Sequence, residues 1–514
     1  MSHHFYYEYV EFDFEKFFTI VLLPKREGKF PTVVCRSPYV NKTVQMPEEE
    51  IVNEYYNGKK RWLDRGYAVV YQHCRGQGKS TGAFVPYVHE REDGLALCEW
   101  IREQSFYNGE LYLFGGSYTS SLHYATAPFE EDVKGALFEV QDSERYRLWY
   151  RNGQMRKGHA NWHFGLYKAK CGLNKNFSKR SFSELPLLGL SERVLGDRAE
   201  DFEEMLLAER PEDEFWNTRF GGADARDAVT DANIPILLTT GYNDFYVGGV
   251  FKMWGKMTER TKVQSAVLVS PYNHGDGYNS EWGVAFPSGK IVEAFGDDFE
   301  IDWFDSIRLG KELPYKKGAV NYYRAYDGRW DNDFYQVPTS EREIVLGSDT
   351  LAFEYDPKDP PAFREEGAIA EPPLWRDDVL CVYTPPFESD VFVKGQMRAS
   401  LSLESTAPDT SFYVRISLEK KDYTYVLRHD VTSLSYQLGD YRENSTVLLD
   451  FTFDEYAFLI KKGERLRVDI SSTDDNGYVV HTNKKGKYYL QNEKSVAKNK
   501  IHLAHSRLYL PIEE

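Results

Sequence analysis

A serine stands where an apolar run meets a stretch of small residues. The sequence LYLFGGSYTSSLHYATA covers residues 111–127, and in it Gly115 and Gly116 precede Ser117. In a nucleophile elbow, a serine sits on a sharp turn between a strand and a helix, and small neighbours let these two elements approach closely. A structural turn would use the same residues, so this stretch alone does not distinguish a nucleophile from a turn.

A serine hydroxyl becomes an effective nucleophile only when a base takes its proton, so a histidine must lie elsewhere in the chain. The best of the twelve histidines is His274 in VLVSPYNHGDG, which directly follows an apolar run. His73 ends another predicted strand and is the weaker candidate. His123 lies inside the helix predicted after Ser117, and we interpret it as structural.

An acid that orients the histidine should follow a further strand. Asp244 has this position in LLTTGYNDFYVGG, although an Asn-Asp pair is also common in turns. The chain order Ser117, Asp244, His274 is that of α/β-hydrolases, and each residue follows a predicted strand. The combination predicts a catalytic triad for acyl transfer.

The elements that would position these residues alternate between strands and helices. A helix is predicted over residues 93–104, and the strand pattern resumes at 234–244 and 265–275. Such alternation predicts a mostly parallel sheet in an α/β fold, with the ligand site at the carboxyl edge of the strands. The strands predicted in the first third of the chain are 18–23, 32–39, 67–74, 111–114 and 135–140.

Two further regions differ from this pattern. The stretch after residue 144 is rich in Arg, Lys, Glu and Trp and contains the amphipathic sequence RAEDFEEMLLAER, which predicts a helical insertion that caps the cleft. From about residue 335, short alternating segments predict an all-β sandwich of the jelly-roll type. The predicted division is a hydrolase part at 1–144 and 226–334, a cap at 145–225 and a jelly roll at 335–514.

Composition excludes several classes of function. The chain has 514 residues and a net charge of −17, which argues against a nucleic-acid partner and leans towards neutral or cationic substrates. Its five widely spaced cysteines indicate reduced thiols, not a disulfide framework or a zinc site. No signal peptide or membrane span is visible, so we expect a cytoplasmic protein without a membrane partner. A homo-oligomer is compatible with the sequence, which does not give the oligomeric state.

The wider sequence resembles one serine hydrolase family, which contains cocaine esterase, α-amino-acid ester hydrolases, glutaryl acylases and X-prolyl dipeptidyl peptidases. The segments that carry the resemblance span most of the chain: RSPYVNK (36–42), DRGYAVVYQHCRGQGKSTGAF (64–84), EDGLALCEWIREQSFYNGELYLFGGSY (92–118), GYNDFYVGG (241–249), PYNHG (271–275), WFD (303–305), APDTSFYVRI (407–416) and GERLRVDISSTD (463–474).

This resemblance implies an α/β-hydrolase domain with an inserted helical cap and a C-terminal jelly roll. It implies Ser117 as nucleophile, His274 as base and Asp244 as orienting acid. It also implies an oxyanion hole formed by the Tyr39 hydroxyl and the Tyr118 backbone N–H. A phenol remains protonated at neutral pH and can donate to an oxyanion.

The chain departs from the family pattern in three places. Ser120 stands where a glycine is usual, and Asn273 stands where Thr or Ser commonly precedes the histidine, but neither change removes a catalytic group. We expect Ser120 to tighten the turn or to alter the substrate range. The chain begins close to the first predicted strand, so we expect no extra N-terminal domain of the kind found in larger X-prolyl peptidases.

Three functions remain open from the sequence. The first is a carboxylesterase or acylase that acts on small to medium esters or amides, with no metal or organic cofactor required. The second is an X-prolyl dipeptidyl aminopeptidase acting on short peptides, for which Asp142 or Glu144 would hold the substrate ammonium, unless both acids are solvated or paired with nearby arginines. The third is a catalytically silent protein that binds a partner through its β-sandwich.

Overall fold

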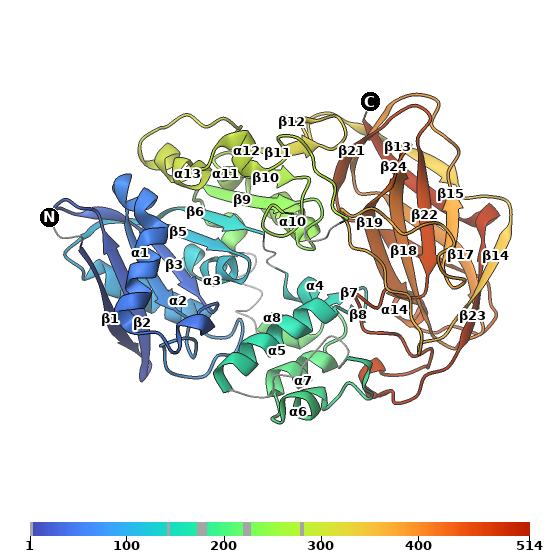
Figure 1. Ribbon diagram of the computed structural model, residues 1–514, viewed down its shortest axis with the longest axis horizontal. Helices are drawn as coiled ribbons and strands as arrows, with labels where there is room; N and C mark the ends of the chain where they lie inside the picture. The colour runs from blue at the N-terminus through green and yellow to red at the C-terminus, as the bar shows by residue number, and fades with distance from the viewer. Residues whose placement is uncertain (1–3, 141–143, 172–181, 219–227, 278–281, 514) are drawn as a thin grey trace.

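The structure is a computed structural model that describes residues 4–140, 144–171, 182–218, 228–277 and 282–513. Figure 1 shows three parts: a mixed α/β part in blue to yellow-green, a group of teal and green helices beside it, and a β-sandwich in orange and red. In this view the teal and green helices lie at the bottom centre, below the green strands, and the yellow-green half of the α/β part lies directly beside the β-sandwich.

Ten strands of the α/β part form one twisted sheet. Neighbouring strands are parallel from β4 to β11, and antiparallel pairs flank them at both edges. All seven segments predicted as strands in this part lie on strands of the sheet, and the predicted mostly parallel sheet is confirmed. In spatial order the strands are β1 (His4–Phe12), β2 (Glu15–Leu23), β4 (Ala68–His73), β3 (Phe30–Ser37), β5 (Tyr107–Gly116), β6 (Val133–Glu139), β9 (Ile236–Gly241), β10 (Ala266–Ser270), β11 (Ala319–Arg324) and β12 (Arg329–Asp331).

Helices cover both faces of this sheet because successive strand residues point to opposite sides. Val33 packs in a hydrophobic cluster with Trp62, whereas the next residue, Val34, packs in another with Leu97. The first face carries α1 (Glu48–Asp64) and α13 (Phe299–Arg308), and the second carries α2 (Glu90–Arg102), α3 (Tyr118–Thr126) and α10 (Val247–Lys256). The short helices α11 (Glu259–Lys262) and α12 (Ile291–Phe295) complete the α/β part.

The insertion between β6 and β9 is mainly helical, as predicted. It has a hydrophobic cluster of its own, in which Trp149, Phe164 and Phe202 are almost fully buried. The same cluster includes Tyr118 of α3 and Val479 of the C-terminal part, so the insertion is packed against both neighbours. Its described elements are α4 (Arg145–Trp149), β7 (Tyr150–Arg151), β8 (Gln154–Met155), α5 (Lys157–Cys171), α6 (Leu190–Leu195), α7 (Glu200–Leu207) and α8 (Glu214–Thr218).

The C-terminal part is a β-sandwich, which confirms the predicted all-β fold. Its larger sheet has the order β14-β23-β17-β24-β16-β21, with β13 on β24 and β20 on β17, and its smaller sheet is β15-β22-β18-β19. The bounds are β13 (Thr339–Val345), β14 (Thr350–Tyr355), β15 (Leu380–Tyr383), β16 (Val391–Gly395), β17 (Arg398–Ser405), β18 (Ser411–Glu419), β19 (Thr424–Ser433), α14 (Leu434–Leu438), β20 (Val447–Thr452), β21 (Tyr456–Ile460), β22 (Arg465–Ser471), β23 (Ala497–His502) and β24 (Arg507–Glu513).

Two expectations from composition concern cysteines and membranes. Cys35, Cys74 and Cys98 are buried free thiols, and Cys381 is a partly buried one. The side chain of Cys171 lies outside the described residues. In the part of the chain that the structure describes, no helix combines the length and the hydropathy needed to cross a membrane.

Candidate active site

Ser117 occupies the sharp connection between β5 and α3. Its backbone has φ 56° and ψ −133°, a conformation that non-glycine residues rarely adopt, and its N–H donates to the Glu139 carbonyl at 2.8 Å. A Cβ on Gly115 would lie 2.5 Å from backbone atoms of Thr119, so a larger residue does not fit there. The small residues of the sequence are therefore a steric requirement of this turn.

Ser120, which departs from the family pattern, ties this turn to the sheet. It is fully buried, and its hydroxyl donates to the carbonyls of Gly115 at 2.7 Å and Glu139 at 3.1 Å. A glycine here would leave both of these carbonyl contacts unmade. The side chain therefore supports the turn from the side of the sheet, which agrees with the expectation that Ser120 tightens it.

Asp244 and His274 lie beyond the carboxyl ends of the neighbouring strands β9 and β10. The imidazole Nδ1 lies 3.0 Å from Oδ2 of the buried Asp244 carboxylate, whose Oδ1 accepts the Tyr246 N–H at 2.9 Å. This pairing assigns the proton to Nδ1 and leaves Nε2 as the ring nitrogen for proton exchange with a hydroxyl. The Phe245 ring stacks on the imidazole at a centroid distance of 5.3 Å and fixes its plane.

The environment of His274 makes it a stronger base than an ordinary histidine. Burial alone would lower its pKa, but the charge and the hydrogen bond of Asp244 more than offset this, and the pKa of His274 lies above its ordinary value. An imidazole with a raised pKa holds an accepted proton more firmly. It is therefore suited to take a proton from a hydroxyl and return it to a leaving group.

Tyr39 lies against Ser117 in the structure. Its hydroxyl accepts the Trp162 indole N–H at 3.2 Å, and the Ser117 side chain and the Tyr118 backbone lie close enough to influence its pKa. Although Tyr39 is 42% exposed, desolvation of its hydroxyl raises its pKa above the ordinary value, so the phenol keeps its proton at neutral pH. The Tyr118 hydroxyl faces away, because it contacts Glu90 and accepts the Tyr87 N–H. Only the backbone N–H of Tyr118 is therefore available beside Ser117.

A cavity of about 600 Å³ brings these groups together, and Ser117, Tyr39 and His274 all line it. The insertion contributes Arg156, His159 and Trp162 to its wall, and the β-sandwich part contributes others, including His429 and Tyr478. A second cavity of about 380 Å³ adjoins it and shares six described lining residues with it. The site is thus built by all three parts of the molecule.

Of the two acids predicted to bind a substrate ammonium, the one that the structure describes, Glu144, is not brought to this cavity. Glu144 forms ion pairs with Lys252 at 2.5 Å and Lys256 at 3.8 Å, and it is not among the lining residues. Asp142 lies outside the described residues. Of the other histidines, His123 is buried and its Nε2 lies 3.0 Å from the Phe114 carbonyl, which agrees with a structural role.

Several lining residues were not predicted from the sequence. His159 and Trp162 lie on α5 three positions apart, and Arg156 lies three positions before His159, just ahead of the helix. This spacing along one helix face is the signal that could have indicated them. His429 and Tyr478 carry no local signal, because only the packing of the β-sandwich against the insertion brings them to the cavity.

The described residues contain no group of three or more His, Cys, Asp or Glu side chains placed to hold a metal ion. The groups that do converge are a hydroxyl, an imidazole with its carboxylate, a phenol and a backbone N–H. This set can deliver a nucleophile, move a proton and stabilise a negative oxygen, which are the requirements of acyl transfer.

Both halves of the chain match known protein families. The pattern of the X-Pro dipeptidyl-peptidase (S15 family) matches residues 16–276, and that of the X-Pro dipeptidyl-peptidase C-terminal non-catalytic domain matches residues 331–508. A curated relative, cocaine esterase from Rhodococcus sp. (strain MB1 Bresler), is 24% identical, and the match covers 95% of each chain.

Solved structures share the fold over nearly the whole chain. An aminopeptidase from a marine sediment Thaumarchaeota archaeon has a TM-score of 0.80 at 16% identity and covers 100% of this chain and 97% of its own. An α-amino acid ester hydrolase has a TM-score of 0.80 at 15% identity, with coverage of 99% and 97%. A CocE/NonD family hydrolase from Staphylococcus aureus has a TM-score of 0.67 at 15% identity, with coverage of 99% and 93%. The chain belongs to the X-Pro dipeptidyl-peptidase (S15) family and is a hydrolase of the serine type.

Proposed function

We propose that this enzyme cleaves ester or amide bonds through an acyl-enzyme on Ser117. The hydrogen bond of 3.0 Å between His274 and the buried Asp244, in the cavity that Ser117 also lines, is the observation that carries the proposal. His274 takes the proton of the Ser117 hydroxyl as its oxygen attacks the substrate carbonyl. Asp244 holds the imidazole in the required tautomer and stabilises the imidazolium that forms.

The Tyr39 hydroxyl and the Tyr118 N–H stabilise the oxyanion of the tetrahedral intermediate. His274 then gives its proton to the leaving alcohol or amine, and the bond between the acyl carbon and that group breaks. A water molecule, deprotonated by the same imidazole, attacks the acyl-enzyme. The acid product leaves, and the Ser117 hydroxyl is restored.

We further propose that the natural substrate is a small or medium ester or amide, so that the enzyme is a carboxylesterase or acylase. The cavity of about 600 Å³ suits a molecule of this size. An X-prolyl dipeptidyl aminopeptidase is the second candidate, because the matching family carries that description. It needs an acid for the free N-terminus, and Glu144 is occupied by two lysines away from the cavity.

We also propose the limits of the three parts of the chain. We place the catalytic part at 1–144 and 226–334, the cap at 145–225 and the jelly roll at 335–514. The end of β6 at Glu139, the start of β9 at Ile236 and the start of β13 at Thr339 support these limits.

The deciding experiment is labelling of the purified protein with a fluorophosphonate probe, followed by peptide mapping. We expect the label on Ser117, and no label in Ser117→Ala. Folded wild-type protein that takes up no label would refute the proposed mechanism and favour a silent binding protein. Parallel assays with p-nitrophenyl esters and with Gly-Pro-p-nitroanilide then separate an esterase from an X-prolyl peptidase.

A further inference from the structure

Arg156 lies at the boundary between the catalytic cavity and the second cavity, and it lines both. It immediately precedes α5, and its backbone is fixed on both sides. Its N–H donates to the Trp149 carbonyl at 2.7 Å, and it forms a β-bridge with Tyr478. The guanidinium is therefore presented to the cavities from a firmly held position.

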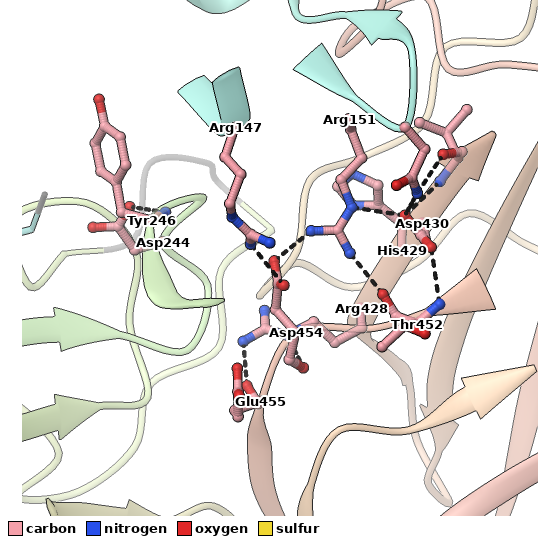
Figure 2. A network of polar contacts seen from close by, with 12 residues as sticks. Arg147, Arg151, Asp244, Tyr246, Arg428, His429, Asp430, Thr452, Asp454 and Glu455 are labelled. Carbon is pink, nitrogen blue, oxygen red and sulfur yellow. Dashed lines mark hydrogen bonds and ion pairs between the residues drawn. The ribbon is translucent and has the colours of Figure 1, made fainter. Parts of the chain in front are cut away.

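Three other cations that line these cavities already have partners. Arg151 pairs with Asp430 and with Asp454, both at 2.7 Å, as Figure 2 shows. Arg364 lies 3.8 Å from the centre of a Trp282 ring and donates to a backbone carbonyl. His429 lies 2.9 Å from Glu366. Their charges are neutralised or occupied within the protein.

Arg156 differs from these three. Its guanidinium forms no ion pair or hydrogen bond with any residue that the structure describes, and its Nε is buried without a partner. Its one neighbour of note is the Tyr478 ring, whose centre lies 5.9 Å away. The two terminal nitrogens of Arg156 are not among the buried atoms without a partner, so they remain accessible, and a ligand acceptor in the cavity can replace water on them.

The acceptor that fits a guanidinium best is a carboxylate, because the two planar groups form parallel charge-assisted hydrogen bonds. Arg156 lines the cavity that Ser117 and His274 also line, so a group bound by Arg156 there shares the space of the substrate. Glu365 lines both cavities as well, and it has an interaction partner of its own. Arg156 is therefore the charge that an anionic ligand at this boundary would need, because the chain as a whole carries a net charge of −17.

We propose that Arg156 binds a carboxylate of the substrate, so that the preferred esters or amides carry a free carboxylate on the acyl part or on the leaving group. This inference rests on the proposed function, since it assigns a substrate class to the same site. It makes Arg156 a determinant of specificity, with no part in the bond-making steps.

The test compares pairs of esters that differ in one carboxylate. On the acyl side the pair is p-nitrophenyl hydrogen adipate and p-nitrophenyl hexanoate, and on the leaving-group side it is para-carboxyphenyl butyrate and its methyl ester. In Arg156→Gln we expect the ratio of kcat/KM for the charged over the neutral ester to fall roughly 10- to 100-fold in one of the two pairs, as for the loss of a hydrogen-bonded charge. The pair that responds identifies the side.

Two variants control this result. Arg364→Gln removes the same charge from the second cavity, but its guanidinium is already engaged, so both ratios should change less than about threefold. Arg156→Lys keeps the charge without the planar fork and should give ratios between those of the wild type and Arg156→Gln. Equal ratios in the wild type and Arg156→Gln for both pairs would overturn the proposal.

A binding measurement separates this inference from the proposed chemistry. Calorimetric titration with adipamate, which carries one carboxylate, should detect binding to the wild type, weaker binding to Arg156→Gln and weaker binding of the neutral adipamide to the wild type. Equal binding of adipamate and adipamide by the wild type would refute the role of Arg156, even where a variant fails to fold. If no ester is hydrolysed, the proposed function fails, and the titration still decides this inference.

Discussion

The sheet edge and the cavity wall are built in different ways. At the edge, Ser117, Asp244 and His274 each follow a strand of one sheet, so backbone geometry places them. In the wall, Arg156 and His429 come from separate parts that are joined by tertiary contacts, including the β-bridge between Arg156 and Tyr478. From this difference we infer that the edge carries the proposed bond-breaking chemistry, whereas the wall selects the substrates. Substitutions at the edge should therefore reduce kcat, and those in the wall should mainly change the choice of substrate.

The largest effect should come from Asp244→Asn. The amide cannot fix the His274 tautomer or stabilise the imidazolium, so we expect kcat for p-nitrophenyl butyrate to fall about 10,000-fold, as in other Ser-His-Asp enzymes. The matched control is Asp276→Asn on the loop of His274, where the carboxylate accepts the Ile291 N–H and lies outside the catalytic cavity. Comparable losses in both variants would mean that the loop, not the carboxylate at 244, limits the rate.

The next effect concerns Tyr39→Phe, which removes one proposed donor to the oxyanion. The loss of such a donor lowers kcat roughly 100- to 1,000-fold. Tyr87→Phe takes a phenol from the same cavity and should retain most of the activity. A kcat near that of the wild type in Tyr39→Phe would show that Tyr39 is not an oxyanion donor and serves only as part of the cavity wall.

A pH profile measures the effect of the Asp244 carboxylate on the pKa of His274. His274 must be neutral to act as a base, and Asp244 raises its pKa above the ordinary value near 6.5. The value of kcat/KM should therefore fall about tenfold per pH unit below that raised pKa. In Asp244→Asn only the lowering effect of burial remains, so the acid limb of the residual activity should move to lower pH. A limb that stays in place or moves upward would contradict the assignment of His274 as the base.

The smallest effect should come from Trp162→Phe, where wall and edge touch. The substitution keeps an aromatic ring but removes the N–H that donates to Tyr39. The loss of one neutral hydrogen bond predicts a decrease in kcat of roughly two- to tenfold. KM for a small acetate ester should change little. A loss as large as that of Tyr39→Phe would show that the insertion takes part in catalysis, and the proposed separation of edge and wall would fail.

The sequence predicts the edge better than the wall for a physical reason. A strand end is a local feature, marked by an apolar run followed by small or polar residues, as at Ser117 and His274. The strand β1 was not predicted, because its exposed and half-buried residues, including Glu8 and Glu11, interrupt the apolar pattern. It is a strand because its backbone pairs with β2 in an antiparallel arrangement at the edge of the sheet, and that pairing does not require an apolar pattern.

The wall depends on contacts between residues that are far apart in the chain. Nothing near His429 indicates that it lies by the cavity, because its ring is brought there by the packing of β19 beside the insertion. The prediction about Glu144 rested on its position just past β6, and the structure turns that side chain to Lys252 and Lys256 instead. Side-chain pairing of this kind is decided by tertiary neighbours that local spacing does not reveal.

The joining of the two cavities has an evolutionary consequence. Six described residues belong to both, and four of them lie in the β-sandwich part: Glu365, His429, Asn476 and Gly477. Over evolution, substitutions in that part can therefore change which substrates the cavity binds while Ser117, Asp244 and His274, which lie in another part of the fold, stay the same.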